Sequence, residues 1–271
     1  MSSGPRPGLL ACSQARISSR KASSAGVKLR SIRAAHLSPD RAPSACVADN
    51  PAVQPKQDTP LRSRTRLAAE PSPAARAVLE KTFGLNDFRP GQADVVAATE
   101  AGADVLFVAP TGSGKSIAYW VPGIAGGGLT LVVSPLIALM VDQVARLNQL
   151  SVRAECLHSQ IPAAARAAIT ARAAAGELRF LYLAPERIGA PGFVDTLRRL
   201  DVGRFVVDEA HCISNWGHDF RPDYRRIGDA IAACGRPPVG AFTATATPRV
   251  RHDIASSLGL REPVERVTGF V

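Results

Sequence analysis

The chain has 271 residues, of which 46% are hydrophobic and 5% aromatic, and a formal net charge of +10. This length suits one large domain or two small ones, with a core built mostly of Ala, Val, Leu and Ile, a composition typical of buried parallel strands. The sequence contains no run of about 18 apolar residues and therefore predicts no membrane span. Its five cysteines are widely spaced without a C-x-x-C pair, which favours a reduced, intracellular and zinc-free protein.

Most of the positive charge lies at the start of the chain. Residues 1–70 contain 12 Lys/Arg and 4 Asp/Glu, whereas the rest contains 21 and 19. Residues 1–73 are rich in Ser, Arg, Pro and Ala without apolar periodicity, which predicts a disordered basic leader. An Arg- and Ser-rich segment whose first acidic residue is Asp40 is similar to an organelle transit peptide. An over-extended start site and a basic tail without folded structure are the alternatives.

From Ala74 onward, short β-rich runs alternate with helical stretches. The predicted strands are Val105–Ala109, Leu129–Val133, Arg153–Leu157, Arg179–Leu183, Arg204–Val207 and Val239–Phe242. The predicted helices include Leu136–Leu150, Ala163–Ala175, Tyr224–Cys234 and Arg249–Leu258. This alternation predicts an α/β fold with a doubly wound parallel sheet over residues 74–271, and ligands at the carboxyl ends of its strands.

A phosphate-binding loop follows the first predicted strand and precedes a helix. Glycines in residues 109–116 let successive backbone N–H groups converge on an anion, and the following helix adds its positive N-terminus. Lys115 is expected to reach the outer phosphates, and the Ser116 hydroxyl to bind Mg²⁺. Ala109 replaces the first glycine of the strict pattern. The predicted phosphate-binding residues are Thr111, Gly112, Ser113, Gly114, Lys115 and Ser116.

A second site of chemistry is the pair of acids that ends the strand Arg204–Val207. Asp208 suits Mg²⁺ as a ligand in its first or second coordination shell, because this cation prefers oxygen. Glu209 is then placed to orient and deprotonate an attacking water. The alternative is that both carboxylates are solvated at a strand end or cap a helix. The loop that carries Lys115 makes that alternative less favoured.

The Asp-Glu-Ala-His box at residues 208–211, together with residues 212–224, resembles motif II and the aromatic-rich loop of RecQ helicases. Other superfamily 2 helicases share the box but not the extension. The resemblance covers Val78 to Val271. It implies a RecA-like P-loop domain with a mostly parallel sheet flanked by helices, and an ATP-dependent 3′–5′ DNA helicase of recombination and repair. ATP and Mg²⁺ are the implied cofactors.

Further segments resemble the remaining family motifs in order. Residues 83–84 and 88–92 resemble motif 0, which implies that Gln92 reads the adenine edge beside Arg89. Residues 133–143 resemble motif Ia and residues 183–187 motif Ib, which bind single-stranded DNA in the family. Residues 242–246 resemble motif III, in which Thr243 and Thr245, with His211, are implied to couple the nucleotide site to DNA.

Each of these motifs also has a purely structural interpretation. Gln92 is then an exposed helix residue, Thr243 and Thr245 are a strand end and a helix cap, and Ser134 with Pro135 forms an ordinary turn. The order of the motifs along the chain argues against this.

The aromatic-rich loop predicts a nucleic-acid contact. Trp216 and Phe220 offer faces for unpaired bases, each worth about 1–3 kcal/mol, and His218 and Arg221 supply polar or cationic contacts. The resemblance implies that this loop makes hydrolysis depend on DNA. Alternatively, Trp216 and Phe220 pack against the sheet edge.

Two departures from the family pattern and three cysteines lie outside the predicted phosphate and metal ligands. Trp120 and Asn215 stand where the family usually has glutamine, which affects the expected fine coupling rather than catalysis. Cys156, Cys212 and Cys234 are predicted to be small buried hydrophobic residues.

The resemblance implies a second RecA-like domain with an arginine finger, which we expect to be absent from these 271 residues. ATP binding with slow hydrolysis and no unwinding is the corresponding expectation. The expected partner is single-stranded or duplex-junction DNA. No membrane is expected as a partner, and the protein is expected to be a monomer. The alternatives are a non-catalytic nucleotide- or DNA-binding fragment and an RNA helicase. A cytoplasmic, nucleoid-associated location is expected if the protein is bacterial. The Arg- and Ser-rich leader is also compatible with a location in the nucleus or an organelle.

Overall fold

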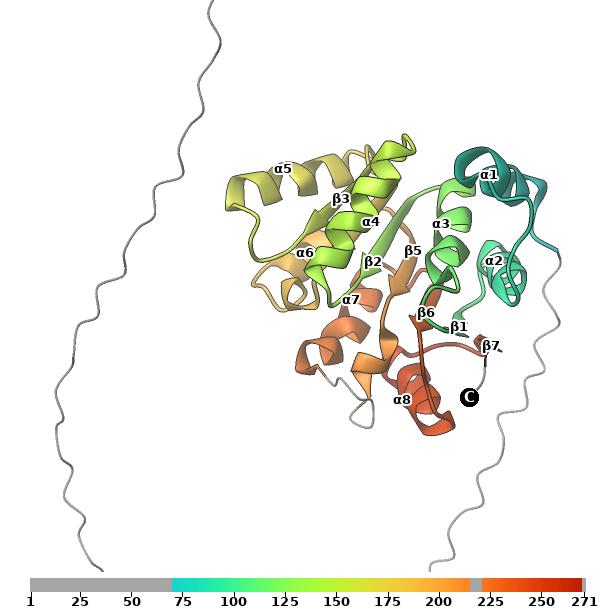
Figure 1. The fold of residues 1–271 in the computed structure, drawn as a ribbon. Coiled ribbons are helices and arrows are strands. Elements are labelled where there is room, and N and C mark those ends of the chain that lie inside the picture. The colour runs from blue at the N-terminus through green and yellow to red at the C-terminus, as the bar shows by residue number, and fades with distance from the viewer. Residues whose placement is uncertain (1–69, 215–220, 270–271) are drawn as a thin grey trace, which may run out of the picture. The chain divides into compact units, whose positions relative to one another are not determined.

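The computed structural model describes residues 70–214 and 221–269, which form an α/β unit (Figure 1). Seven strands make one sheet in the order β3-β4-β2-β5-β6-β1-β7, and every neighbouring pair is parallel. The strands are β1 (Val105–Val108), β2 (Leu129–Val133), β3 (Ala154–Leu157), β4 (Phe180–Leu183), β5 (Val202–Val207), β6 (Val239–Thr243) and β7 (Val264–Val267). The predicted fold class is confirmed. The predicted leader, except its last residues, lies outside the described part.

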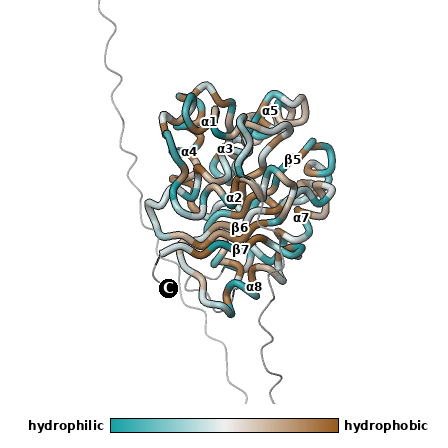
Figure 2. The backbone as a smooth tube through the Cα atoms, turned by 90° about the vertical axis from the view of Figure 1, so that its right-hand side faces the viewer, coloured by the Kyte–Doolittle hydropathy of each residue, from teal (hydrophilic) through white to brown (hydrophobic). Residues whose placement is uncertain are grey.

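Helices cover both faces of the sheet. They are α1 (Pro73–Phe83), α2 (Gln92–Glu100), α3 (Lys115–Ala125), α4 (Ile137–Gln149), α5 (Ala163–Ala174), α6 (Phe193–Leu197), α7 (Ile227–Ala233) and α8 (Pro248–Leu258). The buried side chains of α1–α4 belong to one apolar cluster and those of α5–α8 to another. Figure 2 shows the strands β6 and β7 between α2 and α8.

The two apolar clusters explain why a central strand such as β1 is apolar at every position. In β1, Val105 and Phe107 face the cluster of α1–α4, whereas Leu106 and Val108 face the cluster of α5–α8. Side chains alternate between the faces of a strand, so a sheet covered on both faces needs consecutive apolar residues. All four residues of β1 are buried.

The six predicted strands are present, with ends that agree to within two residues. The short edge strand β7 and the helices α1, α2 and α6 were not predicted. The predicted helix Tyr224–Cys234 is wrong in its first turn, because Pro222–Arg226 forms a 3₁₀-helix before α7 begins at Ile227. No helix among residues 70–214 and 221–269 is long and apolar enough to cross a membrane.

The folded part begins slightly earlier than the predicted boundary at Ala74. Helix α1 begins at Pro73, and the Ser72 side chain accepts a hydrogen bond from the backbone N–H of Ala75 as its N-cap. The backbone N–H and the hydroxyl of Ser72 donate to the carboxylate of Glu100 at 2.9 and 2.6 Å. Ser72 therefore joins α1 to the end of α2.

Asp104 ties together three segments at the amino-terminal edge of the sheet. Its buried carboxylate accepts hydrogen bonds from the backbone N–H groups of Val239 and Arg261 at 2.8 and 2.7 Å. The Arg236 guanidinium donates to both carboxylate oxygens at 3.2 and 2.5 Å. Removal of the carboxylate takes the acceptor from the two backbone N–H groups and the counter-charge from Arg236, a change that costs several kcal/mol.

We therefore expect Asp104→Ala to lower the free energy of unfolding by about 3–5 kcal/mol, measured by urea denaturation. Asp195→Ala is the control, because its ion pair with Arg198 is exposed and is expected to contribute less than about 1 kcal/mol. Equal denaturation midpoints for the two variants would contradict the assigned role of Asp104.

Candidate active site

Four strands end together at one edge of the sheet and carry the predicted motifs. The P-loop follows β1, Ser134 follows β2 and Asp208 follows β5, while Thr243 is the last residue of β6. Strand β6 lies between β5 and β1. The carboxyl edge of a parallel sheet is where such folds bind ligands. The fold thus places these motifs, far apart in sequence, at a common edge.

The P-loop has the backbone of an anion-binding turn. Gly112 and Gly114 have φ values of 78° and 83°, a left-handed conformation that favours glycine. A Cβ atom at Gly114 would lie 2.8 Å from Gln92 Nε2. Helix α3 begins at Lys115, so its N-terminal N–H groups point toward the loop.

Two polar side chains of the loop fit a phosphate group. Lys115 Nζ donates to the carbonyl oxygens of Ala109 and Pro110 at 2.9 and 3.3 Å, across the loop. Ser113 Oγ is buried and has no hydrogen-bond partner within residues 70–214 and 221–269. A buried hydroxyl without a partner is costly, and a phosphate oxygen would supply one. The donor set therefore suits a nucleotide.

Gln92 is buried and holds the P-loop. Its Nε2 donates to the carbonyl oxygens of Ser113 and Gly114 at 3.1 and 2.9 Å, and its Oε1 accepts from the backbone N–H of Arg89 at 2.9 Å. Arg89 Nη1 donates to the Gly112 carbonyl at 2.7 Å. The alternative that Gln92 is an exposed helix residue is wrong. Its contact with adenine stays a prediction.

Asp208 is buried at the end of β5. Burial raises the pKa of its carboxyl to about 7, with a further increase from the charge of Glu209. The backbone N–H of Glu209 and the charges of Lys115 and His211 act in the opposite direction. The interpretation of Asp208 as a solvated strand end is therefore wrong. A buried carboxylate oxygen and the Ser116 hydroxyl are the hard oxygen ligands that Mg²⁺ prefers.

Glu209 and the predicted coupling residues form a connected group. Glu209 Oε2 lies 3.3 Å from His211 Nδ1, which lies 2.9 Å from Thr243 Oγ1. The Thr243 hydroxyl donates to the Thr245 carbonyl at 3.1 Å. Thr243 is buried, and Thr247 rather than Thr245 caps α8. The interpretation of Thr245 as a helix cap is thus wrong.

The backbone of Glu209 is held in an uncommon conformation. Its φ and ψ are 49° and 45°, in the left-handed region that non-glycine residues occupy at some energetic cost. Its backbone N–H donates to Asp208 Oδ1 at 3.0 Å. The conformation directs the two successive acids differently, since Asp208 is buried and the Glu209 side chain is 23% exposed.

The Glu209 side chain borders a cleft of about 330 Å³. The residues that line it come from the P-loop and from motifs Ia, II and III: Thr111, Pro135, Leu136, Glu209, His211, Cys212, Ala244 and Thr245. The cleft thus has Glu209 and Thr111 of the P-loop among its walls.

The predicted nucleic-acid contacts Trp216, His218 and Phe220 lie outside the described residues, as does Asn215. Arg221, which follows them, is described. Its backbone N–H donates to the Cys212 carbonyl at 2.9 Å, and its Nη1 donates to the Pro135 carbonyl at 3.3 Å. The carboxyl end of the aromatic-rich loop is thus attached to the motif Ia segment.

Trp120 is a core residue. It is buried, its Nε1 donates to Tyr182 Oη at 2.7 Å, and its ring stacks on Phe83 with centroids 5.8 Å apart. Trp120 therefore contributes its ring and its N–H to the packing of the core. Of the three described cysteines, Cys212 is buried as predicted, whereas Cys156 and Cys234 are only partly buried.

Two residues near the P-loop were missed by sequence reasoning. Tyr119 Oη and the Gln143 side-chain amide lie within hydrogen-bonding distance of Ser116 Oγ. Gln143 is the last residue of the segment that resembles motif Ia. The signal was weak, because helical spacing does not reveal which residue of α4 faces Ser116.

Comparisons with known proteins identify the class. Residues 89–254 match the DEAD/DEAH box helicase family model. The chain belongs to this family, which implies the use of ATP, generally with Mg²⁺. Solved structures agree in fold: a Pyrococcus furiosus Hef helicase domain has a TM-score of 0.53 at 22% identity, covering 71% of this chain and 39% of that one. The structure of the DUF1998 helicase MrfA bound to DNA has a TM-score of 0.58 at 18% identity, and the match covers 73% of this chain and 29% of that one.

Curated relatives narrow the class to RecQ-type helicases. The probable ATP-dependent DNA helicase RecS of Bacillus subtilis is 40% identical over 70% of this chain and 38% of its own length. The ATP-dependent DNA helicase RecQ of Haemophilus influenzae is 39% identical over 79% of this chain and 34% of its own length. Mouse ATP-dependent DNA helicase Q5 is 42% identical over 70% of this chain and 20% of its own length. The described unit is a RecQ-type motor domain, and the chain covers less than two fifths of each of these relatives.

Proposed function

We propose that this chain is the ATP-binding domain of a 3′–5′ DNA helicase of the RecQ type that acts in recombination and repair. The observation that carries this proposal is the common edge at which the P-loop lysine Lys115 and the acids Asp208 and Glu209 meet. Single-stranded or duplex-junction DNA is the proposed partner, and a monomer the proposed state.

Each site residue has a role in this proposal. The N–H groups and hydroxyls of the P-loop bind the phosphates of ATP, and Lys115 neutralises their outer charge. Ser116 and Asp208 would hold Mg²⁺, and the bound ion would neutralise charge on the phosphates. Glu209 accepts a hydrogen bond from water and takes its proton. His211 orients Glu209 through their contact at 3.3 Å, and Thr243 in turn orients His211 through a contact at 2.9 Å.

For the isolated 271-residue polypeptide we expect ATP binding, slow hydrolysis and no strand separation. The reason is that an arginine finger from a second sheet domain contributes about a thousandfold or more to the rate in related enzymes. Calorimetric titration with ATP and Mg²⁺, followed by single-turnover hydrolysis, tests this. Absence of ATP binding would refute the proposed function, and robust unwinding would refute the expected limit on activity.

Single-stranded DNA is expected to increase the single-turnover rate, and an RNA of equal length and sequence is expected to increase it less. Trp216→Ala should remove most of the DNA effect, because one stacked base is worth about 1–3 kcal/mol. ATP affinity without DNA should stay unchanged. Equal stimulation by RNA would favour the RNA-helicase alternative. If wild type, Lys115→Ala and Trp216→Ala were equally inert, the non-catalytic binding fragment would be favoured.

A further inference from the structure

A small polar cluster lies beneath the Ser116 hydroxyl. Tyr119 Oη is 3.3 Å from Ser116 Oγ and 3.2 Å from Gln143 Oε1, and Gln143 Nε2 is 3.5 Å from Ser116 Oγ. Ser116 and Tyr119 are three residues apart on α3, so they lie on the same face of that helix. Gln143 comes from α4, and both Tyr119 and Gln143 are buried.

The direction of the hydrogen bonds follows from the chemistry of the groups. A tyrosine hydroxyl has an ordinary pKa of about 10, so it carries its proton at neutral pH. An amide oxygen only accepts, and therefore Tyr119 donates its proton to Gln143 Oε1. The lone pairs of Tyr119 Oη then remain to accept the proton of the Ser116 hydroxyl.

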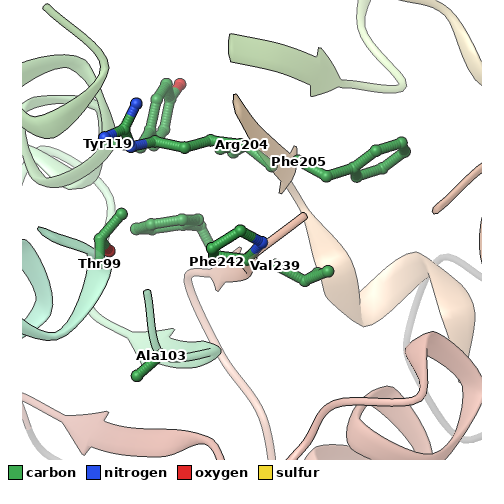
Figure 3. A pocket seen from close by; sticks show the side chains of 10 residues that line it. Thr99, Ala103, Tyr119, Arg204, Phe205, Val239 and Phe242 are labelled. Atoms are coloured by element: carbon green, nitrogen blue, oxygen red, sulfur yellow. The ribbon is translucent and has the colours of Figure 1, made fainter. Parts of the chain in front are cut away.

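The position of the Tyr119 hydroxyl is set by packing of its ring. The ring of Phe242 packs edge-on against it with centroids 5.0 Å apart, and that of Trp120 with centroids 6.3 Å apart. Figure 3 shows Tyr119 and Phe242 in the wall of one small cavity, together with Arg204. A ring packed in this way cannot swing freely, so its hydroxyl is a fixed acceptor for Ser116.

We propose that Tyr119 and Gln143 are positioning residues for the metal-binding hydroxyl of Ser116. A hydroxyl that binds a cation through a lone pair must direct its proton elsewhere, and Tyr119 provides the acceptor for it. Gln143 orients Tyr119 in turn, so the chain runs from Ser116 through Tyr119 to Gln143. This inference rests on the proposed function, in which Ser116 binds Mg²⁺.

The test is the Mg²⁺ dependence of nucleotide binding in Tyr119→Phe, measured with fluorescently labelled ADP over a series of Mg²⁺ concentrations and in excess EDTA. We expect the Mg²⁺ concentration that gives half of the full tightening to rise about tenfold, as for other partners of metal ligands. The dissociation constant in EDTA should stay the same. Gln143→Met should shift the Mg²⁺ dependence in the same direction, and it serves as the test if Tyr119→Phe fails to fold.

Thr130→Val is the matched control, because it removes another buried hydroxyl, on β2, that takes no part in the chain from Ser116 to Gln143. It should leave the Mg²⁺ dependence at the wild-type value. If Tyr119→Phe and Gln143→Met also keep that value while wild type requires Mg²⁺, the inference is overturned and the proposed function stands. If wild-type binding of ADP shows no Mg²⁺ dependence, the metal site fails, and the inference fails with it.

Discussion

Replacement of Glu209 by glutamine is expected to slow single-turnover ATP hydrolysis by about 10²–10⁴-fold, the usual contribution of a general base. Glutamine has nearly the same shape but cannot accept the proton of the attacking water. The contact of Glu209 Oε2 with His211 Nδ1 at 3.3 Å is compatible with an amide oxygen at that position. ATP affinity should change by less than about twofold, since Glu209 adds no phosphate or metal ligand.

The hydrolysis rate and the ATP dissociation constant are measured on the same preparation, with and without single-stranded DNA. Glu262→Gln is the matched control. Glu262 also has a positive φ, 41° against 49° for Glu209, but it precedes β7 at the opposite edge of the sheet. An unchanged rate in Glu209→Gln, or an equal loss in Glu262→Gln, would remove Glu209 from the proposed mechanism.

The second large effect is expected for Lys115→Ala. Loss of a charged donor to a phosphate should weaken ATP binding about 10- to 100-fold, since hydrogen bonds to charged groups contribute about 1.5–3 kcal/mol. Hydrolysis should fall further, because charge on the phosphates increases as the terminal group is transferred. Lys115→Arg should restore only part of the affinity, because a planar guanidinium does not reproduce a compact ammonium group.

Binding is measured by calorimetry and folding by thermal unfolding. Lys81→Ala is the control: Lys81 is in the last turn of α1, and its removal should leave ATP affinity unchanged. The contacts of Lys115 Nζ in the structure are with loop carbonyls, so a modest change in unfolding temperature is compatible with the proposal. Wild-type affinity for ATP in Lys115→Ala would contradict the assignment of this loop to phosphate binding.

The sequence alone determined the features whose chemistry is local. The P-loop is recognisable because its glycines, lysine and serine must be consecutive to surround a phosphate. Asp208 and Glu209 are recognisable because they directly follow a buried strand. Six strands were predicted because a sheet covered on both faces requires apolar runs. Strand β7 has charged residues at Glu265 and Arg266 and lies at the sheet edge, so it lacks that signal.

Only the tertiary structure decided which distant residues meet. The order of β5, β6 and β1 brings His211 to Thr243, 32 residues apart, and packing of α4 on the sheet brings Gln143 to Ser116, 27 residues apart. Packing of α2 beside α3 buries Gln92 against the P-loop carbonyls. Such contacts depend on strand order and helix packing, which many sequences with the same local pattern could satisfy differently. Local pattern thus determined the reacting groups, and long-range packing determined the partners that orient them.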